Sequence, residues 1–253
     1  MPLLTPADPA SVTIHNADAA SPFLVLCDHA GRRVPEKLGD LGLPAAEFER
    51  HIAWDIGAGG LSRRLGDRLG ACVIEQTYSR LVIDCNRWPD AADCVPDLVD
   101  GTSIAANFNL SAAAAIERRA EIYMPYHDAI SAVLDARAAC DLPTQLILMH
   151  SFTPRLAMSA PGGDRPWHVG VLHAHDSALS DTMLRLLKAE PGYVIGDNQP
   201  YAMDGADYTA PHHAGGRALD YCELEVRQDL IASAEGQAHY ADLLARLLIA
   251  ALG

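Results

Sequence analysis

The chain has 253 residues, of which 49% are hydrophobic and 21% charged, a balance that is ordinary for a soluble globular protein with one self-sufficient core. Its formal net charge of −14 at pH 7 comes without a basic stripe, which argues against nucleic acid and anionic membranes as partners. No apolar run approaches the roughly 20 residues that a membrane span requires.

The N-terminal segment, residues 1–19, is predicted to be a flexible lead-in to a single domain that takes up the chain 1–253. It lacks the basic start and the apolar stretch of a signal peptide. The six cysteines show no Cys-x-x-Cys spacing and mostly lie in apolar segments, which favours free buried thiols in a reducing compartment. We therefore expect a cytoplasmic protein.

The first half of the chain alternates strand-like and helical patterns. Residues 23–27 form a short apolar run that ends at a turn-like Asp-His-Ala-Gly sequence, as a strand does. Apolar residues recur at helical spacing from 47 to 69, although three glycines weaken the middle of that predicted helix. Two β-branched runs, at 72–75 and 81–84, then predict a pair of neighbouring strands.

The second half opens with a strongly helical pattern from Ser111 to 139, which has a Ser cap and which Pro125 should kink or split. The remaining expected elements are strands at 145–149, 168–172 and 221–226 and helices at 179–190 and 235–252. The order of elements and the buried character of the strands predict the α/β class, as a three-layer α/β/α fold around a mixed sheet.

In such a sheet, ligands bind beyond the carboxyl ends of the strands. His29, His150 and His173 each follow an apolar run, so their three imidazoles are expected to face one crevice. This expected convergence is the first argument for a functional site.

Three side chains are candidate ligands for a divalent metal. His29 and His150 are held at the ends of predicted strands, which suits ligands of Zn²⁺. Asp55 follows His51 by four residues, so a helix would place both side chains on one face and offer a third ligand. Asp28 would either orient the imidazole of His29 or serve as a turn residue. The alternatives are histidines that only hydrogen-bond the strand ends and a solvated helix face.

Arg80, Asn86 and Arg87 lie across one predicted strand and its end. An Arg side chain offers a bidentate fork to a carboxylate, and Asn adds a neutral donor. These residues therefore predict a carboxylate-binding site, with surface arginines and a structural Asn cap as the alternative.

Glu223, Glu225 and Arg227 alternate along a predicted strand and therefore share one of its faces. Three charged side chains on an interior strand are costly unless they serve a polar cavity. Glu225 is the candidate general base and Arg227 a candidate substrate-binding residue, with a plain Arg–Glu ion pair as the alternative. His213 lies in a loop predicted at 212–217, which either closes over a substrate or is simply solvated.

With these residues identified, the chain resembles the N-formylglutamate amidohydrolase family. That family is itself distantly similar to the zinc carboxypeptidases and aspartoacylases, so the resemblance implies a phosphorylase/hydrolase-like α/β/α fold and metal-dependent deacylation. Two departures stand out: Arg32 replaces the acid of a His-x-x-Glu pair, and Asp-His-Ala-Gly replaces the Pro-His-Ser-Gly that is typical of the family. The matching segments are Asp28–Gly31 with Val34–Pro35, Trp54–Asp55, Tyr78–Arg87, Tyr126–His127, His150–Ser151, Asn198–Tyr201 and Glu223–Leu230.

The expected activity is the hydrolysis of a small anionic N-acyl amino acid. His29, Asp55 and His150 are expected to hold a divalent metal, with Zn²⁺ preferred, and to leave one position for water. Glu225 is expected to act as general base. The resemblance assigns the substrate carboxylate to Asn86 and Arg87, and Arg80 is expected to polarise the scissile carbonyl or to assist in holding that carboxylate.

Two rival functions remain open on the sequence. One is a non-catalytic protein that binds small ligands on a decayed hydrolase scaffold, which predicts tolerance of Glu225→Gln. The other is a metal-free hydrolase with Ser151 as nucleophile, although the chain has no Gly-x-Ser-x-Gly elbow.

Overall fold

The computed structural model describes residues 2–160, 163–174, 177–203 and 205–253. Over these residues, seven strands form one sheet in the order β1-β3-β2-β6-β9-β7-β8, and β4 (Leu98–Val99) pairs with β5 (Thr102–Ser103) in a small separate hairpin. The strands of the large sheet are β1 (Val12–His15), β2 (Phe23–Cys27), β3 (Cys72–Gln76), β6 (Gln145–Phe152), β7 (Val169–Leu172), β8 (Ile195–Asp197) and β9 (Tyr221–Arg227).

The large sheet is mixed. β3, β2, β6 and β9 are mutually parallel, so their carboxyl ends meet at one edge. β1 runs antiparallel to β3, and β7, which pairs with β8 in parallel, runs antiparallel to β9.

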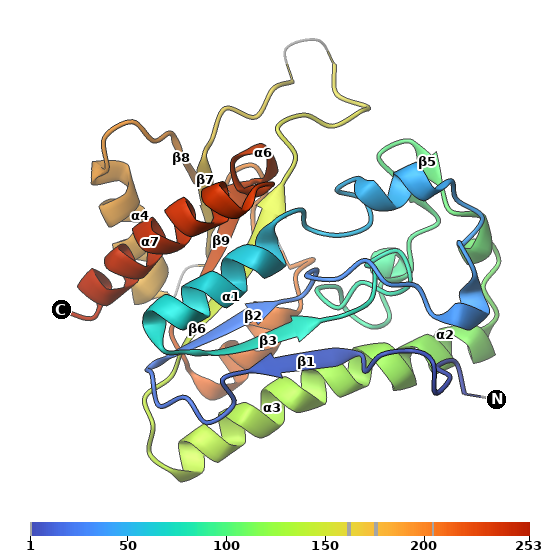
Figure 1. Ribbon diagram of the computed structural model, residues 1–253, viewed down its shortest axis with the longest axis horizontal. Helices are drawn as coiled ribbons and strands as arrows, with labels where there is room; N and C mark the ends of the chain where they lie inside the picture. Colours follow the sequence, from blue (N-terminus) through green and yellow to red (C-terminus); the bar gives the residue numbers. More distant parts are fainter. Residues whose placement is uncertain (1, 161–162, 175–176, 204) are drawn as a thin grey trace.

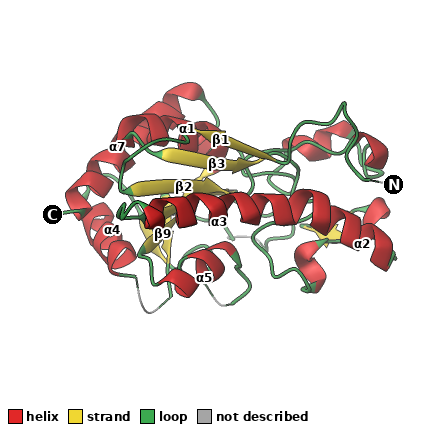
Figure 2. Cartoon of the chain, turned by 90° about the horizontal axis from the view of Figure 1, so that it is seen from below, coloured by secondary structure: helices red, strands yellow, loops and turns green. Residues whose placement is uncertain are grey.

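Helices cover both faces of the sheet (Figure 1). The helix α1 packs against α7 and, with α4, covers one face, while α3 runs along the other face, where Figure 2 shows it in the foreground. The α-helices are α1 (Ala58–Leu69), α2 (Ala112–Arg118), α3 (Met124–Ala139), α4 (Ala178–Ala189), α5 (Thr209–His213), α6 (Gln228–Ile231) and α7 (Ala234–Ala251). The short helices are η1 (Glu36–Leu38), η2 (Ala45–Glu49), η3 (Ala92–Cys94), η4 (Ala105–Asn107), the π-helical η5 (Arg119–Tyr123) and η6 (Gly215–Arg217).

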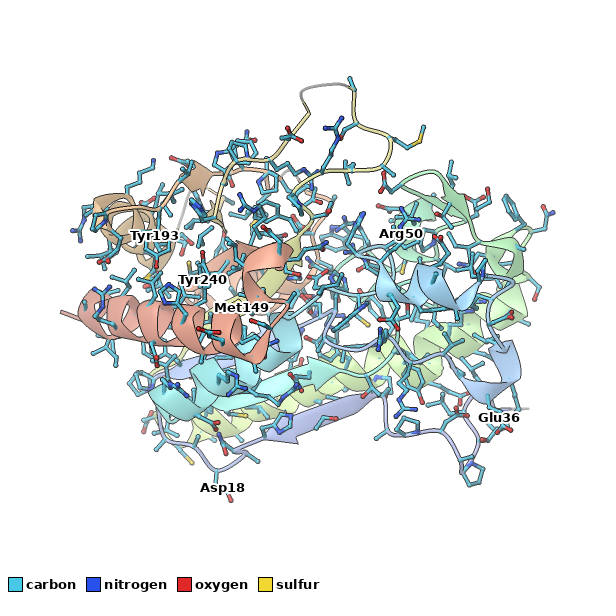
Figure 3. The ribbon with its side chains drawn as sticks, turned by 45° about the horizontal axis from the view of Figure 1, so that its top comes forward. Asp18, Glu36, Arg50, Met149, Tyr193 and Tyr240 are labelled. Carbon is cyan, nitrogen blue, oxygen red and sulfur yellow. The ribbon has the colours of Figure 1, made fainter. Side chains whose placement is uncertain are left out.

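The two faces of each central strand belong to two different hydrophobic clusters. Leu24 and Leu26 pack on the α3 side, whereas Val25 and Cys27 pack on the side of α1 and α7. Met149 of β6, labelled in Figure 3, is fully buried in the second of these clusters. This alternation, buried on both sides, is what a covered parallel sheet requires, and it confirms the predicted three-layer α/β fold.

The predicted strand at 81–84 is wrong, because the structure has a turn at 81–82 and no regular structure at 83–84. Val82 N–H donates to the Ser79 carbonyl at 2.9 Å, and Asp84 N–H donates to the Cys94 carbonyl at 2.7 Å, so the backbone bonds locally instead of joining the sheet. The run is apolar because its side chains are buried in the core on the α3 side.

The predicted helix from 47 to 69 is split. Gly57 has φ +84°, a left-handed conformation that L side chains rarely adopt, and α1 begins directly after it. Asp55 therefore lies in the turn before α1, and the expectation that His51 and Asp55 share a helix face is wrong. The helix expected from Ser111 is confirmed with its Ser cap, and it passes through the π-helical η5 immediately before Pro125.

The N-terminal lead-in is also corrected. β1 pairs with β3 along its length, and Leu3 is buried with its backbone N–H donated to Glu121. Met1 lies outside the described residues. The described helices are all too short or too polar to cross a membrane.

Candidate active site

The candidate site lies where the carboxyl ends of β2, β6 and β9 meet. His29 follows β2, while His150 lies within the last part of β6 and pairs in register with Glu225 of β9. Gly31 allows the turn after His29 to pack tightly, because a Cβ at this position would lie 1.9 Å from the Thr77 carbonyl oxygen. Asp55 reaches the same point from the turn before α1, where its backbone N–H donates to the His29 carbonyl at 3.0 Å.

His29, Asp55 and His150 offer one ligand atom each, and these atoms lie within 4.8 Å of one another. Oδ2 of Asp55 is 2.9 Å from Nδ1 of His150 and 3.5 Å from Nδ1 of His29. All three side chains are buried. The structure thus brings together the three predicted metal ligands.

Two further carboxylates lie beside the Nε2 atoms of the two imidazoles. Nε2 of His29 lies 2.7 Å from Oδ1 of Asp84, and Nε2 of His150 lies 3.2 Å from Oδ2 of Asp28. Since a carboxylate only accepts, Nδ1 of His150 donates to Oδ2 of Asp55 in this structure, and a metal ion bound here would replace that proton. Thr209 holds Asp28 in turn, since its hydroxyl donates to Oδ1 at 2.9 Å.

The donor set fits a divalent metal. Nδ1 of His29 is buried and has no hydrogen-bond partner among the described residues, which is costly unless a ligand satisfies it. Two imidazole nitrogens and one carboxylate oxygen are a typical protein ligand set of catalytic zinc, in which water takes the fourth position. His29, Asp55 and His150 would therefore hold such an ion.

The charges around the histidines are strongly coupled. Burial by itself lowers the pKa of His29, but the Asp84 and Asp55 carboxylates outweigh it and raise that pKa. Burial likewise opposes the charge on Asp84, yet Arg80 and His29 hold its pKa well below the usual range. The site is therefore a cluster of ionised acids that favours bound positive charge.

Arg80 lines the cavity beside this cluster. Its Nε and Nη2 both donate to Oδ2 of Asp84, at 3.0 and 2.6 Å, while Nη1 makes only a 3.5 Å contact with Asp55. Asp84 thus fixes the guanidinium group and leaves Nη1 as the nitrogen best able to reach a ligand.

Glu225 and Glu223 both project from β9 into the cavity, as their alternation predicts. Both are buried, and Oε2 of each has no hydrogen-bond partner among the described residues. Burial raises the pKa of Glu225 to about 7, and it raises that of Glu223 well above its usual value. A carboxyl group with a pKa near neutral can both take up and release a proton.

Asn86 and Arg87 also line the cavity, as expected. Both already contact an acid of the chain, because Oδ1 of Asp207 accepts from Nδ2 of Asn86 at 3.2 Å and from Nη1 of Arg87 at 3.1 Å. Asp207 is not among the site residues that the sequence predicts.

Arg227 and His213 are not brought to the cavity, so their expected role in substrate binding finds no support. Arg227 ends β9 and directs its guanidinium to Asp229, with Nε 2.8 Å from the carboxylate. His213 belongs to α5 rather than to an open loop, and it is buried with Nε2 3.0 Å from Nδ1 of His127. His173 also lies apart from the metal ligands and pairs with Asp197 at 2.9 Å.

Ser151 does not have the surroundings of a nucleophile. Its hydroxyl donates to the Ile56 carbonyl at 2.9 Å, and its backbone N–H donates to Oδ2 of Asp55 at 3.2 Å. A serine nucleophile requires a base that accepts its proton, and here a carbonyl takes that place.

The cavity has a volume of about 890 Å³, room for a small substrate. Apolar side chains, among them Leu98, Val99 and Leu156, line part of its wall. On its rim, His51 and Arg50 hold Asp100 at 3.0 and 3.2 Å, and Arg50 is labelled in Figure 3. His51 thus lines the cavity without joining the metal ligands.

Comparisons with known proteins relate the chain to one family. The family model of N-formylglutamate amidohydrolase matches residues 21–232, whereas a search of curated proteins finds no match. The crystal structure of gene product Atu2144 from Agrobacterium tumefaciens is 35% identical, with a TM-score of 0.94 over 99% of this chain and 98% of that chain. The N-formylglutamate amidohydrolase from Ralstonia eutropha JMP134 shares the fold, with 20% identity and a TM-score of 0.64 over 96% of this chain and 97% of that chain. The chain belongs to the N-formylglutamate amidohydrolase family.

Proposed function

We propose that this protein is a metal-dependent amidohydrolase that removes a formyl-like acyl group from an N-acylated acidic amino acid such as N-formyl-L-glutamate. The observation that carries the proposal is the convergence of His29, Asp55 and His150 beside the buried carboxyl group of Glu225, whose Oε2 has no hydrogen-bond partner among the described residues. Membership of the N-formylglutamate amidohydrolase family supports the amide bond as the target.

Zn²⁺ is the ion we expect, and when bound it would polarise the substrate carbonyl and lower the pKa of a coordinated water toward about 7. His29, Asp55 and His150 would hold it. Asp84 and Asp28 face Nε2 of the two imidazoles, which would leave Nδ1 of each ring for the metal.

Glu225 has the role of general base and then general acid. Its carboxylate accepts the proton of the attacking water and returns it to the nitrogen of the leaving amino acid, so the C–N bond breaks without release of an amide anion. A pKa of about 7 suits both steps at neutral pH, because neither protonation state is strongly preferred.

Arg80 would donate from Nη1 to the carbonyl oxygen as negative charge develops there. Its position is fixed by the two hydrogen bonds to Asp84, which lowers the cost of reorganisation in the reaction. Asn86 and Arg87 would bind the substrate carboxylate, which fixes the orientation of the scissile bond.

The test is the release of formate from N-formyl-L-glutamate by protein reconstituted with one equivalent of zinc, beside the same protein stripped with a chelator. We expect turnover only in the zinc-loaded sample and its recovery when zinc is returned to the stripped one. Turnover that is unaffected by stripping contradicts the metal-dependent mechanism. Absence of turnover with N-formyl, N-acetyl and N-succinyl amino acids alike contradicts the enzymatic function and favours a ligand-binding role.

A further inference from the structure

The carboxylate-binding pair of the site already binds a carboxylate that the chain itself supplies. A single oxygen, Oδ1 of Asp207, accepts from Nδ2 of Asn86 at 3.2 Å and from Nη1 of Arg87 at 3.1 Å. Asp207 lines the same cavity, and its side chain is 13% exposed. The contact thus reproduces, within the protein, the interaction that a substrate carboxylate needs.

The backbone fixes this contact in place. Oδ1 of Asn86 accepts from the backbone N–H groups of Tyr208 and Thr209, at 3.1 and 3.0 Å. Arg87 and Asp207 also form an isolated antiparallel β-bridge. Asn86 therefore uses one end of its amide to hold the segment and the other end to bind its carboxylate, and Asp207 is held facing the pair.

Arg87 has a second acidic partner on another nitrogen. Asp93 accepts from Nε at 3.0 Å, and its side chain is 60% exposed. Oδ1 of Asp207 occupies the position at Nη1 that a substrate carboxylate would take. Asp93 contacts neither Nη1 nor Asn86 among the described contacts, so it adds charge without blocking that place.

We propose that Asp207 is a specificity-determining residue, an internal carboxylate that a substrate carboxylate must displace from Asn86 and Arg87. This inference rests on the proposed function for its substrate. Its consequence is that anionic substrates bind less tightly than Asn86 and Arg87 alone would allow. Uncharged analogues, by contrast, leave Asn86 and Arg87 hydrogen-bonded to Asp207. The site therefore discriminates only weakly between a substrate carboxylate and the corresponding amide.

The test compares the isosteric variants Asp207→Asn and Asp93→Asn, both zinc-loaded. Each variant removes one negative charge beside Arg87, but only Asp207→Asn removes the carboxylate that contacts both Asn86 and Arg87. Since charge-assisted hydrogen bonds are stronger than neutral ones, we expect Asp207→Asn to lower KM for N-formyl-L-glutamate by about tenfold, equivalent to about 1.4 kcal/mol, against at most about twofold for Asp93→Asn. KM for the uncharged diamide of the same compound should change little.

A second measurement does not depend on turnover. Calorimetric titration with glutarate, which has no amide to hydrolyse, should give a Kd about tenfold lower for Asp207→Asn than for the wild type or Asp93→Asn. Asp207→Ala, which keeps the backbone bridge, should do the same and replaces the first variant if that one does not fold. Equal glutarate affinity in all variants, or weaker binding after Asp207→Asn, overturns the inference. If wild type fails to release formate while the glutarate affinities differ as expected, only the proposed reaction is wrong.

Discussion

Nε2 of His29 lies 2.7 Å from Oδ1 of Asp84, and the same carboxylate receives two hydrogen bonds from Arg80 through its other oxygen. One buried acid therefore fixes both a proposed metal ligand and the arginine that lines the cavity beside it. Because each oxygen of Asp84 serves a different partner, neither the imidazole nor the guanidinium can rotate without losing a charge-assisted hydrogen bond. Asp84 thus links metal binding to the orientation of the proposed carbonyl-binding group.

Replacing the carboxylates behind the histidines should weaken the metal site without removing a ligand. Asp84→Asn and Asp28→Asn are each expected to lower zinc affinity by about 10- to 100-fold, because a carboxylate beside Nε2 orients the imidazole and makes it more basic. Competition with a chromophoric chelator measures the affinity. Asp28→Asn leaves Arg80 untouched, and Asp100→Asn, which loses a partner of His51 on the same cavity, is the control. Equal affinities in all three variants would contradict the role of these carboxylates.

The ligand assignment itself can be tested by metal content. We expect about one zinc per chain in protein purified without a histidine tag, as one three-ligand site holds one ion. His150→Ala should lose most of it, since two ligands remain. His51→Ala is the matched control, because His51 lines the same cavity but pairs with Asp100. Elemental analysis gives both numbers, and zinc loss in His51→Ala as large as in His150→Ala would refute the assignment.

The convergence of His29 and His150 was predictable because each follows or ends an apolar run, and parallel strands deliver their carboxyl ends to one edge of the sheet. Asp55 joins the two histidines, but not by the expected route. It was expected on a helix face with His51, whereas it lies in the turn that Gly57 forces before α1. The local pattern does not show where a helix begins when the break is a single glycine.

Other parts of the site depend on contacts between distant segments, which periodicity does not contain. Asp84 was read as the end of a strand, and its partner His29 lies 55 residues away. Asp207 meets Asn86 over a separation of 121 residues, with no local signal. Arg227 shows the opposite error: alternation placed it on the correct strand face, but β9 extends past the cavity at that residue.

Glu225→Gln should abolish most of the turnover while the protein still binds zinc. Loss of a general base costs about 10²- to 10⁴-fold in kcat, and the isosteric amide cannot accept the proton of water. Glu223→Gln is the control, since Glu223 is the other buried acid on the same face of β9. Formate release and zinc content are measured on both. A larger kcat loss in Glu223→Gln than in Glu225→Gln would transfer the role to Glu223.

Ser151→Ala separates the metal-dependent reaction from a serine-nucleophile reaction. Because the Ser151 hydroxyl donates to the Ile56 carbonyl, its removal should cost about 1 kcal/mol of unfolding free energy and leave kcat within about threefold. Urea unfolding and formate release measure the two effects. Loss of turnover in a variant that remains folded and zinc-loaded would mean that Ser151 takes part in the chemistry.

The pair His127 and His213 should make the fold sensitive to acid. Nε2 of His127 lies 2.9 Å from the Cys85 carbonyl, which only accepts, so Nε2 carries a proton. With both rings neutral, Nδ1 of His127 then accepts from Nε2–H of His213 at 3.0 Å. Burial lowers the pKa of His127 to about 4 and that of His213 to about 3, an effect that the charge of Asp28 opposes and that His212 reinforces.

The sign of the resulting pH dependence follows from proton uptake. An unfolded histidine binds its proton near pH 6.5, whereas these two remain neutral in the folded state down to about pH 4, so acid favours unfolding. The stabilisation is complete above about pH 6.5 and declines as the pH falls toward 4, by about 2 kcal/mol for His127 alone between pH 7 and 5. Urea titrations at pH 7 and pH 5 measure this decline.

In His213→Gln, whose amide can still donate to His127, the loss of stability between these two pH values should be smaller than in wild type. The surface variant His239→Gln should behave as wild type does, and equal losses in all three proteins would show that the pair does not govern the acid sensitivity.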